Sequence, residues 1–311
     1  MNKGNHRTIG GQAVIEGVLF RGPHGYAIAV RRPDGEIVWK EQEHQSPAAR
    51  YPWKLPILRG MAMMWDSLAL GTRALNWSAE MAMPKDEKFK KPNKFATTLT
   101  FLFAIIIGLG LFVGVPYLLT TLLKSEFNLN DQDVLFNVID GAFRIVLVVG
   151  YILFTTIFKD VRRVYQYHGA EHKTINTYES GYEPTTESVK KFTRFHPRCG
   201  TSFIVVVLLV LILLHSIVFA LLPYDMTFGA KLAVRLALIP IVAGLAYEVI
   251  RFSGKHADKW WAKPFIWPGV STQHITTREP DEQMLEVALF SFHKVRELEE
   301  RAEGATTADN A

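Results

Sequence analysis

Residues 202–222 read SFIVVVLLVLILLHSIVFALL, and only His215 and two serines interrupt the apolar side chains. A helix of this length is about 30 Å long, which matches the hydrocarbon core of a bilayer. Three other stretches have the same character, at about 95–123, 134–158 and 232–250. The sequence therefore predicts a membrane protein with four transmembrane helices.

The composition agrees with apolar blocks separated by ordinary polar sequence. The chain has 311 residues, 49% of them hydrophobic, and a mean hydropathy of +0.09. Its net charge of +5 comes from Lys and Arg that flank the apolar blocks, so membrane topology explains the charge better than nucleic-acid binding does. The single cysteine, Cys199, excludes an internal disulfide framework. The first residues contain no apolar segment typical of a cleaved signal peptide.

The distribution of basic residues predicts the orientation. Eight Lys and Arg residues lie between the second and third apolar stretches, whereas the two short connections hold Lys124 and Lys231 only at their edges. Loops rich in Lys and Arg stay on the cytosolic side. We therefore expect a multi-pass protein of the plasma (inner) membrane, with both termini and the middle loop in the cytosol.

The polar segments predict a cytosolic α+β portion. Residues 1–94 combine a small antiparallel β-meander with an amphipathic helix at about 56–82, which would lie on the membrane interface or pack under the meander. Transmembrane helices 1 and 2 fill 95–158, a cytosolic His/Cys loop fills 159–201, and helices 3 and 4 fill 202–250. Residues 251–311 form a cytosolic segment with a helix at 281–303 and a disordered tail.

Two pairs of residues in the middle loop have the spacing of metal ligands. His168, Glu171 and His172 form an H-x-x-E-H pattern, and in a helix the two histidines share one face, where they can bind one metal ion. Glu171 would then be the general base that activates water. His196 and Cys199 form a second pair, and a cytosolic thiolate is a good zinc ligand. The alternative is a chance match, with histidines that only reach the headgroup level.

Four motifs resemble one known family. GGQAVIEGVLFRGP, DVRRVYQYHGAEHKTIN, HPRCGTSF and TTREPDEQMLEVA are similar to segments of the YqhQ-like bacterial membrane proteins, filed as domain of unknown function 1385. The resemblance covers roughly residues 8–300. It implies a multi-pass plasma-membrane protein, and some members of that family are described as predicted metal-dependent enzymes.

Other charged residues lie in or near the apolar stretches. H-x-x-E-H is also the inverzincin motif, whose third ligand is a distant glutamate, and Glu248 stands 76 positions after His172. Pairing of Glu248 with Arg251 or Arg162 is the competing interpretation. Asp140 and Arg144, spaced i and i+4, can neutralise each other inside the second helix, with Arg235 as a possible third member. This set favours a clamp between helices over an ion pathway.

Three functions remain open at this point. The leading hypothesis is a metal site, zinc first, that is structural if all four ligands bind one ion and hydrolytic if one ligand stands apart. The alternative is a non-enzymatic scaffold or assembly factor for other membrane proteins, and a transporter comes third. The expected partner is the lipid bilayer, other membrane proteins are an open alternative, and no nucleic acid is expected.

Overall fold

The computed structural model describes residues 9–84, 93–127, 129–130, 133–222, 226–257 and 259–309. The predicted outer connection at 223–225 and the stretch 85–92 lie outside these ranges, whereas most of the predicted outer connection at 124–133 lies within them. The chain divides into two compact units. The first comprises 1–89, 155–197 and 273–311, and the second comprises 90–154 and 198–272.

The first unit is built on a four-stranded antiparallel sheet in the order β1-β2-β3-β4, which confirms the predicted meander. The strands are β1 (Gly10–Val14), β2 (Gly17–Arg21), β3 (Gly25–Arg31) and β4 (Ile37–Glu43). Alternating side chains on β2 and β3 point to opposite faces, as the period of a strand requires. Both faces are therefore apolar, and each needs a cover.

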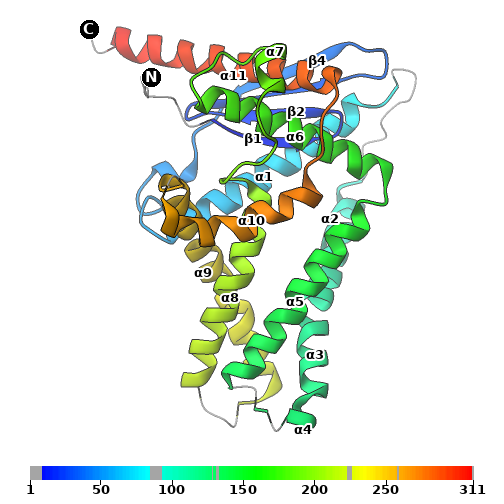
Figure 1. Cartoon of the computed structure of the whole chain (residues 1–311), viewed down its shortest axis with the longest axis vertical. Coiled ribbons are helices and arrows are strands. Elements are labelled where there is room, and N and C mark those ends of the chain that lie inside the picture. Colours follow the sequence, from blue (N-terminus) through cyan, green and yellow to red (C-terminus); the bar gives the residue numbers. More distant parts are fainter. Residues whose placement is uncertain are drawn as a thin grey trace. The chain divides into compact units, whose positions relative to one another are not determined.

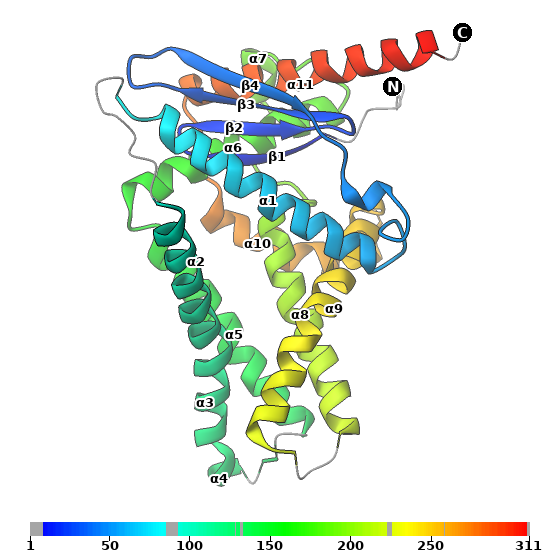
Figure 2. The same ribbon diagram turned by 180° about the vertical axis from the view of Figure 1, so that it is seen from behind.

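Helices cover both faces of this sheet (Figures 1 and 2). On one face, α1 (Leu58–Met81) packs Leu70 and Ala74 against Leu19 and Ile28. On the other face, α6 (Lys159–Glu179) and α11 (Glu282–Asp309) enclose a core around Phe20. The sheet thus fixes α6, the helix that carries the H-x-x-E-H pattern.

Shorter elements complete the first unit. The first is η1 (Pro47–Ala49), which precedes α1. The second is α7 (Thr186–Lys190), and Thr185 caps its N-terminus. Two expectations change here: most of the predicted His/Cys loop is helical, and α11 continues to Asp309 where the sequence indicated a disordered tail. In α6 the core contacts of Tyr167, Ala170 and Ile175 stabilise a helix that contains an otherwise polar sequence.

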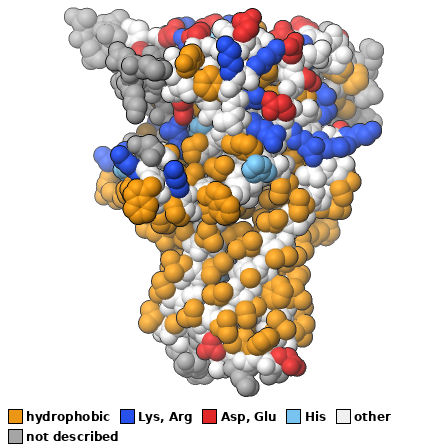
Figure 3. All heavy atoms as spheres, viewed as in Figure 1, with side chains coloured by type: hydrophobic (Ala, Val, Ile, Leu, Met, Phe, Trp, Pro, Cys, Tyr) orange, Lys and Arg blue, Asp and Glu red, His pale blue; other side chains and the backbone are white. Residues whose placement is uncertain are grey.

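Among the described residues, the second unit contains four helices long and apolar enough to cross a membrane: Thr98–Leu122, Val134–Thr155, Gly200–Leu221 and Gly229–Lys255. Their elements are α2 (Lys94–Leu109), the π-helical turn η2 (Gly110–Gly114), α3 (Val115–Leu122), α5 (Val134–Thr155), α8 (Gly200–Leu221) and α9 (Phe228–Lys255). The short α4 (Lys124–Phe127), η3 (Trp260–Ala262) and α10 (Lys263–Thr276) follow or precede them. Figure 3 shows that hydrophobic side chains cover the visible face of these helices.

Buried charges join two of these helices, in the arrangement that the sequence indicated. Arg144 donates through Nε to Asp140 at 2.8 Å and through Nη1 to the Phe112 carbonyl at 2.9 Å. Arg235 on α9 donates to the same Asp140 at 3.4 Å. All three charged side chains are buried. One carboxylate therefore links α5 to α9 as a clamp.

Candidate metal centre

The candidate centre begins with three side chains of α6. His168 and His172 lie one turn apart on one face, with ring centroids 4.4 Å apart. Between them in sequence, Glu171 places Oε2 3.8 Å from Nε2 of His168 and 3.7 Å from Nε2 of His172. Glu171 and His172 are buried and His168 nearly so. Two imidazoles and one carboxylate therefore converge in the first unit.

Backbone carbonyls hold both imidazoles in one tautomer. Nδ1 of His168 lies 2.8 Å from the Thr276 carbonyl, and Nδ1 of His172 lies 2.6 Å from the Arg194 carbonyl. A carbonyl oxygen only accepts, so each Nδ1 carries the proton, and in the neutral ring Nε2 then carries the lone pair. Metal-ligating histidines are typically oriented by such an Nδ1–H bond. Both Nε2 atoms are thus prepared as ligands on the side where Glu171 lies.

The segment that supplies the Arg194 carbonyl is itself fixed by hydrogen bonds. Asn176 on α6 donates to the carbonyls of Thr193 and Phe195, at 2.7 and 3.0 Å. Gln273 accepts from the backbone N–H of His196 at 2.8 Å and donates to its carbonyl at 2.7 Å. Hydrogen bonds with Asn176 and Gln273 therefore hold the segment 193–196 in place, and they position the Arg194 carbonyl against His172.

Two glycines admit close neighbours to α6. At Gly169, between the two histidines of the motif, a Cβ would collide with the Arg278 carbonyl, so glycine allows the chain around Thr276 to approach. At Gly11 on β1, a Cβ would lie 2.5 Å from Cγ of Glu171. Glu171 therefore lies directly against the β1 backbone.

The surroundings of Glu171 affect its acidity. Burial raises the pKa of the Glu171 carboxyl above its ordinary value, while positive charge on His168 and His196 acts in the opposite direction. A carboxyl of raised pKa among histidines is typical of functional sites.

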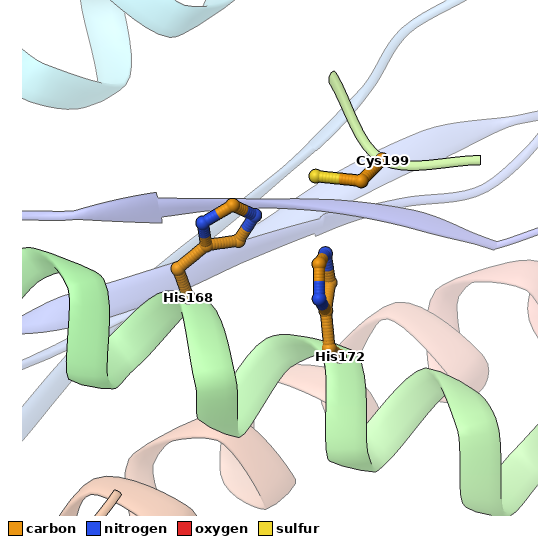
Figure 4. Close-up of side chains that lie close together, drawn as sticks. All are labelled: His168, His172 and Cys199. Carbon is orange, nitrogen blue, oxygen red and sulfur yellow. The ribbon is translucent and has the colours of Figure 1, made fainter. Parts of the chain in front are cut away.

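The two residues of the second predicted pair, His196 and Cys199, lie in different surroundings. The Cys199 thiol has its Sγ within 4.8 Å of ligand nitrogens of His168 and His172, which likewise lie within 4.8 Å of each other. Figure 4 shows the thiol facing the two rings. Cys199 is also the N-cap of α8, where Sγ accepts from the Thr201 N–H.

His196 lies near this group but has another polar neighbour. Its ring centroid is 5.7 Å from that of His172, and its Nε2 lies 3.2 Å from Oε2 of Glu179. His196 is not among the three residues whose ligand atoms converge. Glu248 lies in α9, half-buried, and is not one of the three either.

Sequence reasoning did not find the residues that orient the ligands. Thr276 and Arg194 act through backbone carbonyls, which carry no residue-type signal. Gln273, Asn176 and Glu179 are ordinary polar residues in the sequence. Gly11 offered a weak signal, because a glycine inside a strand often marks a close approach of another group.

Comparison with known proteins agrees with the resemblance in the motifs. The family model described as "Protein of unknown function (DUF1385)" matches residues 55–298. The chain belongs to this family. It is also 37% identical over 306 residues to the uncharacterized protein YqhQ of Bacillus subtilis (strain 168), and the match covers 94% of each chain. No solved structure matches the chain.

Proposed function

We propose that this protein is a multi-pass protein of the plasma membrane, with both termini and the candidate centre in the cytosol. Four apolar helices and the concentration of Lys and Arg between α5 and α8 support this topology. Impermeant thiol labelling of intact cells tests it. A cysteine at Asn130 should react from outside, and one at Thr185 should not; reaction at Thr185 would reverse the orientation.

We further propose that His168, His172 and Cys199 bind a zinc ion and that the site is hydrolytic. The observation that carries this proposal is the pair of Nδ1–H bonds, which leaves two Nε2 acceptors together beside a buried carboxylate. Imidazole nitrogens and a thiolate are the donor types that zinc prefers. The residues present therefore fit this metal.

The count of ligands favours catalysis over a purely structural site. Zinc sites that close with four protein ligands are structural, whereas catalytic sites use three and keep one position open. Among the described residues, the ligand atoms of three side chains converge, those of His168, His172 and Cys199, while Nε2 of His196 lies beside Glu179. The predicted four-ligand set is reduced in this proposal to three, with His196 as a neighbour that helps to hold the segment.

Each residue of the chain then has a distinct task. Zinc would supply Lewis-acid activation of water and substrate. Glu171, which lies against both Nε2 atoms, would accept a proton at its carboxylate and return it to the leaving group. The Thr276 and Arg194 carbonyls keep the imidazoles oriented throughout.

Cobalt substitution tests the ligand set directly. Cobalt bound to a thiolate gives a charge-transfer absorption that Cys199→Ser should remove, while His196→Ala should keep it. At metal concentrations high enough to saturate the variant, Glu171→Gln should abolish hydrolysis of any substrate found by screening esters, amides and phosphodiesters. Loss of the absorption in His196→Ala would instead support the predicted site with four ligands, which is structural.

One observation favours a scaffold as the second candidate. The bonds of Asn176 and Gln273 make the centre a junction between α6, the 193–196 segment and the end of α10. A metal at such a junction could act mainly as a staple. In that case chelation would lower the thermal midpoint strongly, whereas removal of a catalytic metal would change it little.

A further inference from the structure

The outer side of α1 is apolar although its inner side already packs on the sheet. Gly60, Ala62, Leu70 and Ala74 are among the buried residues of the inner side. On the opposite side, Trp65 is 72% exposed and Leu68 59% exposed. The exposed set follows the spacing of one helical face: Met61 (half-buried), Trp65, Leu68, Thr72 and Leu75. The predicted packing of this helix against the meander therefore accounts for its inner side only.

The segment before α1 extends this surface. Tyr51, Trp53 and Leu55 are exposed large hydrophobic residues. Together with Trp65, Leu68 and Leu75 they form what we call the α1 surface. A helix that keeps a second apolar side after packing has a further partner to cover it.

Two basic residues stand in the segment before α1. Arg50 and Lys54 are both exposed and residues 47–57 contain no acidic residue, whereas α1 itself contains two basic and two acidic residues. Asp66 is buried on the inner side, where it accepts from Arg21 at 2.5 Å and lies 2.9 Å from Nε2 of His44. The outer side is thus apolar and aromatic, and Arg50 and Lys54 lie in the segment that adjoins it, which suits an anionic lipid surface.

The chain connection limits the distance between the end of α1 and α2. α1 ends at Met81 and the next described helix, α2, begins at Lys94. Thirteen peptide steps reach at most about 45 Å when fully extended. If α2 and α3 cross the membrane, Met81 stays within that distance of the first residue of α2.

We infer that the α1 surface lies on the anionic headgroup layer of the membrane, with Trp65 and Leu68 at the level of the upper acyl chains. Trp and Tyr prefer this interfacial level, and basic residues pair with lipid phosphates there. The inference rests on the proposed membrane topology but is independent of the metal centre. It would make the sheet unit a peripheral domain held flat on the bilayer.

Quenching of a fluorescent thiol label in lipid nanodiscs tests the inference on the full chain. Three positions of similar exposure carry the label: Leu68→Cys at 59%, Glu300→Cys on α11 at 60%, and Ile106→Cys on α2 at 66%. The chain without an added cysteine gives the background, because native Cys199 is buried. Lipid-borne nitroxide should quench the labels at Leu68 and Ile106, and aqueous iodide should quench the label at Glu300.

The outcomes separate this inference from the topology. If Ile106 is lipid-quenched while Leu68 behaves like Glu300, the helices are embedded and the inference is wrong. A Leu68 label shielded from both quenchers would mean that protein covers the surface, which also overturns it. If Ile106 itself escapes lipid quenching, the topology fails, and the inference fails with it.

The basic residues provide a second test. Changing Arg50 and Lys54 together to Gln should lower lipid quenching at Leu68 in anionic nanodiscs, since each charge near the surface favours docking by roughly fivefold. The same variant should differ little from the parent in zwitterionic nanodiscs. An unchanged signal in anionic nanodiscs would overturn the assignment to anionic lipid.

Discussion

Gly11→Ala should weaken metal binding through Glu171 alone. A Cβ at Gly11 would lie 2.5 Å from Cγ and 2.6 Å from Oε1 of Glu171. Gly10, its neighbour on β1, has no atom within 4 Å of the corresponding position. The same substitution at Gly10 is therefore a matched control in the same strand, with a similar effect on backbone entropy.

The expected loss of zinc affinity in Gly11→Ala follows from the distance between the new Cβ and Glu171. Carbon atoms in ordinary contact are about 3.5–4.0 Å apart, so Glu171 must move by about 1 Å to admit the new methyl group. Crowding of this kind typically costs about 1–3 kcal/mol of stability. Displacing a carboxylate that supports metal ligands typically lowers metal affinity by about 10- to 100-fold. Gly11→Ala should thus raise the zinc Kd by that factor, and Gly10→Ala by less than about twofold.

The assay is zinc titration against a chromophoric chelator, with the thermal midpoint measured on the same samples. Adding Glu171→Ala to Gly11→Ala removes the clash, so it should restore the midpoint while zinc affinity stays low. Equal zinc affinity in the two single variants would refute the placement of Glu171 at the centre. A restored affinity in the double variant would show that Glu171 does not support the metal.

Two further predictions concern charges away from the centre. Asp140→Asn leaves two buried guanidinium groups without a carboxylate and should lower the stability by about 3–5 kcal/mol. Arg144→Gln leaves the neutral pair of Asp140 with Arg235 and should lower the stability less. Thermal melts in detergent rank the two variants, and the reverse order would contradict the clamp. Burial alone raises the pKa of Asp66, but the bonds and charges of Arg21 and His44 outweigh it and hold the pKa below its ordinary value. The carboxylate therefore stabilises the fold above about pH 4, and this stability is lost as the pH falls through the folded-state pKa. Asp66→Asn should flatten that acid dependence of the thermal midpoint, and an unchanged slope between pH 6 and 3 would show that other groups cause it.

Periodicity and composition were enough for the elements that repeat a simple pattern. The stretch around His215 is long and apolar, and the runs that became β2 and β3 alternate or are continuously apolar between turn residues. Such segments form helices and strands from local physics. The Asp140–Arg144 pairing followed from helical spacing alone, because residues four apart share one face.

The candidate centre could be predicted only in part. The i, i+4 spacing placed His168 and His172 together once α6 was helical, and Cys199 was marked by its residue type. The carbonyls that orient the rings come from Thr276 and Arg194, far along the chain, and their approach depends on tertiary packing. The engagement of His196 with Glu179 likewise needed the fold of the 193–196 segment.

Metal content of the purified full chain tests the central claim most directly. After zinc loading and removal of excess metal, elemental analysis should find about one zinc per chain in the parent. His168→Ala/His172→Ala should lose it, while the control His256→Ala/His293→Ala, which changes two half-buried histidines elsewhere, should keep it. A parent chain without zinc, or a His168→Ala/His172→Ala chain that still holds one equivalent, would contradict the metal centre.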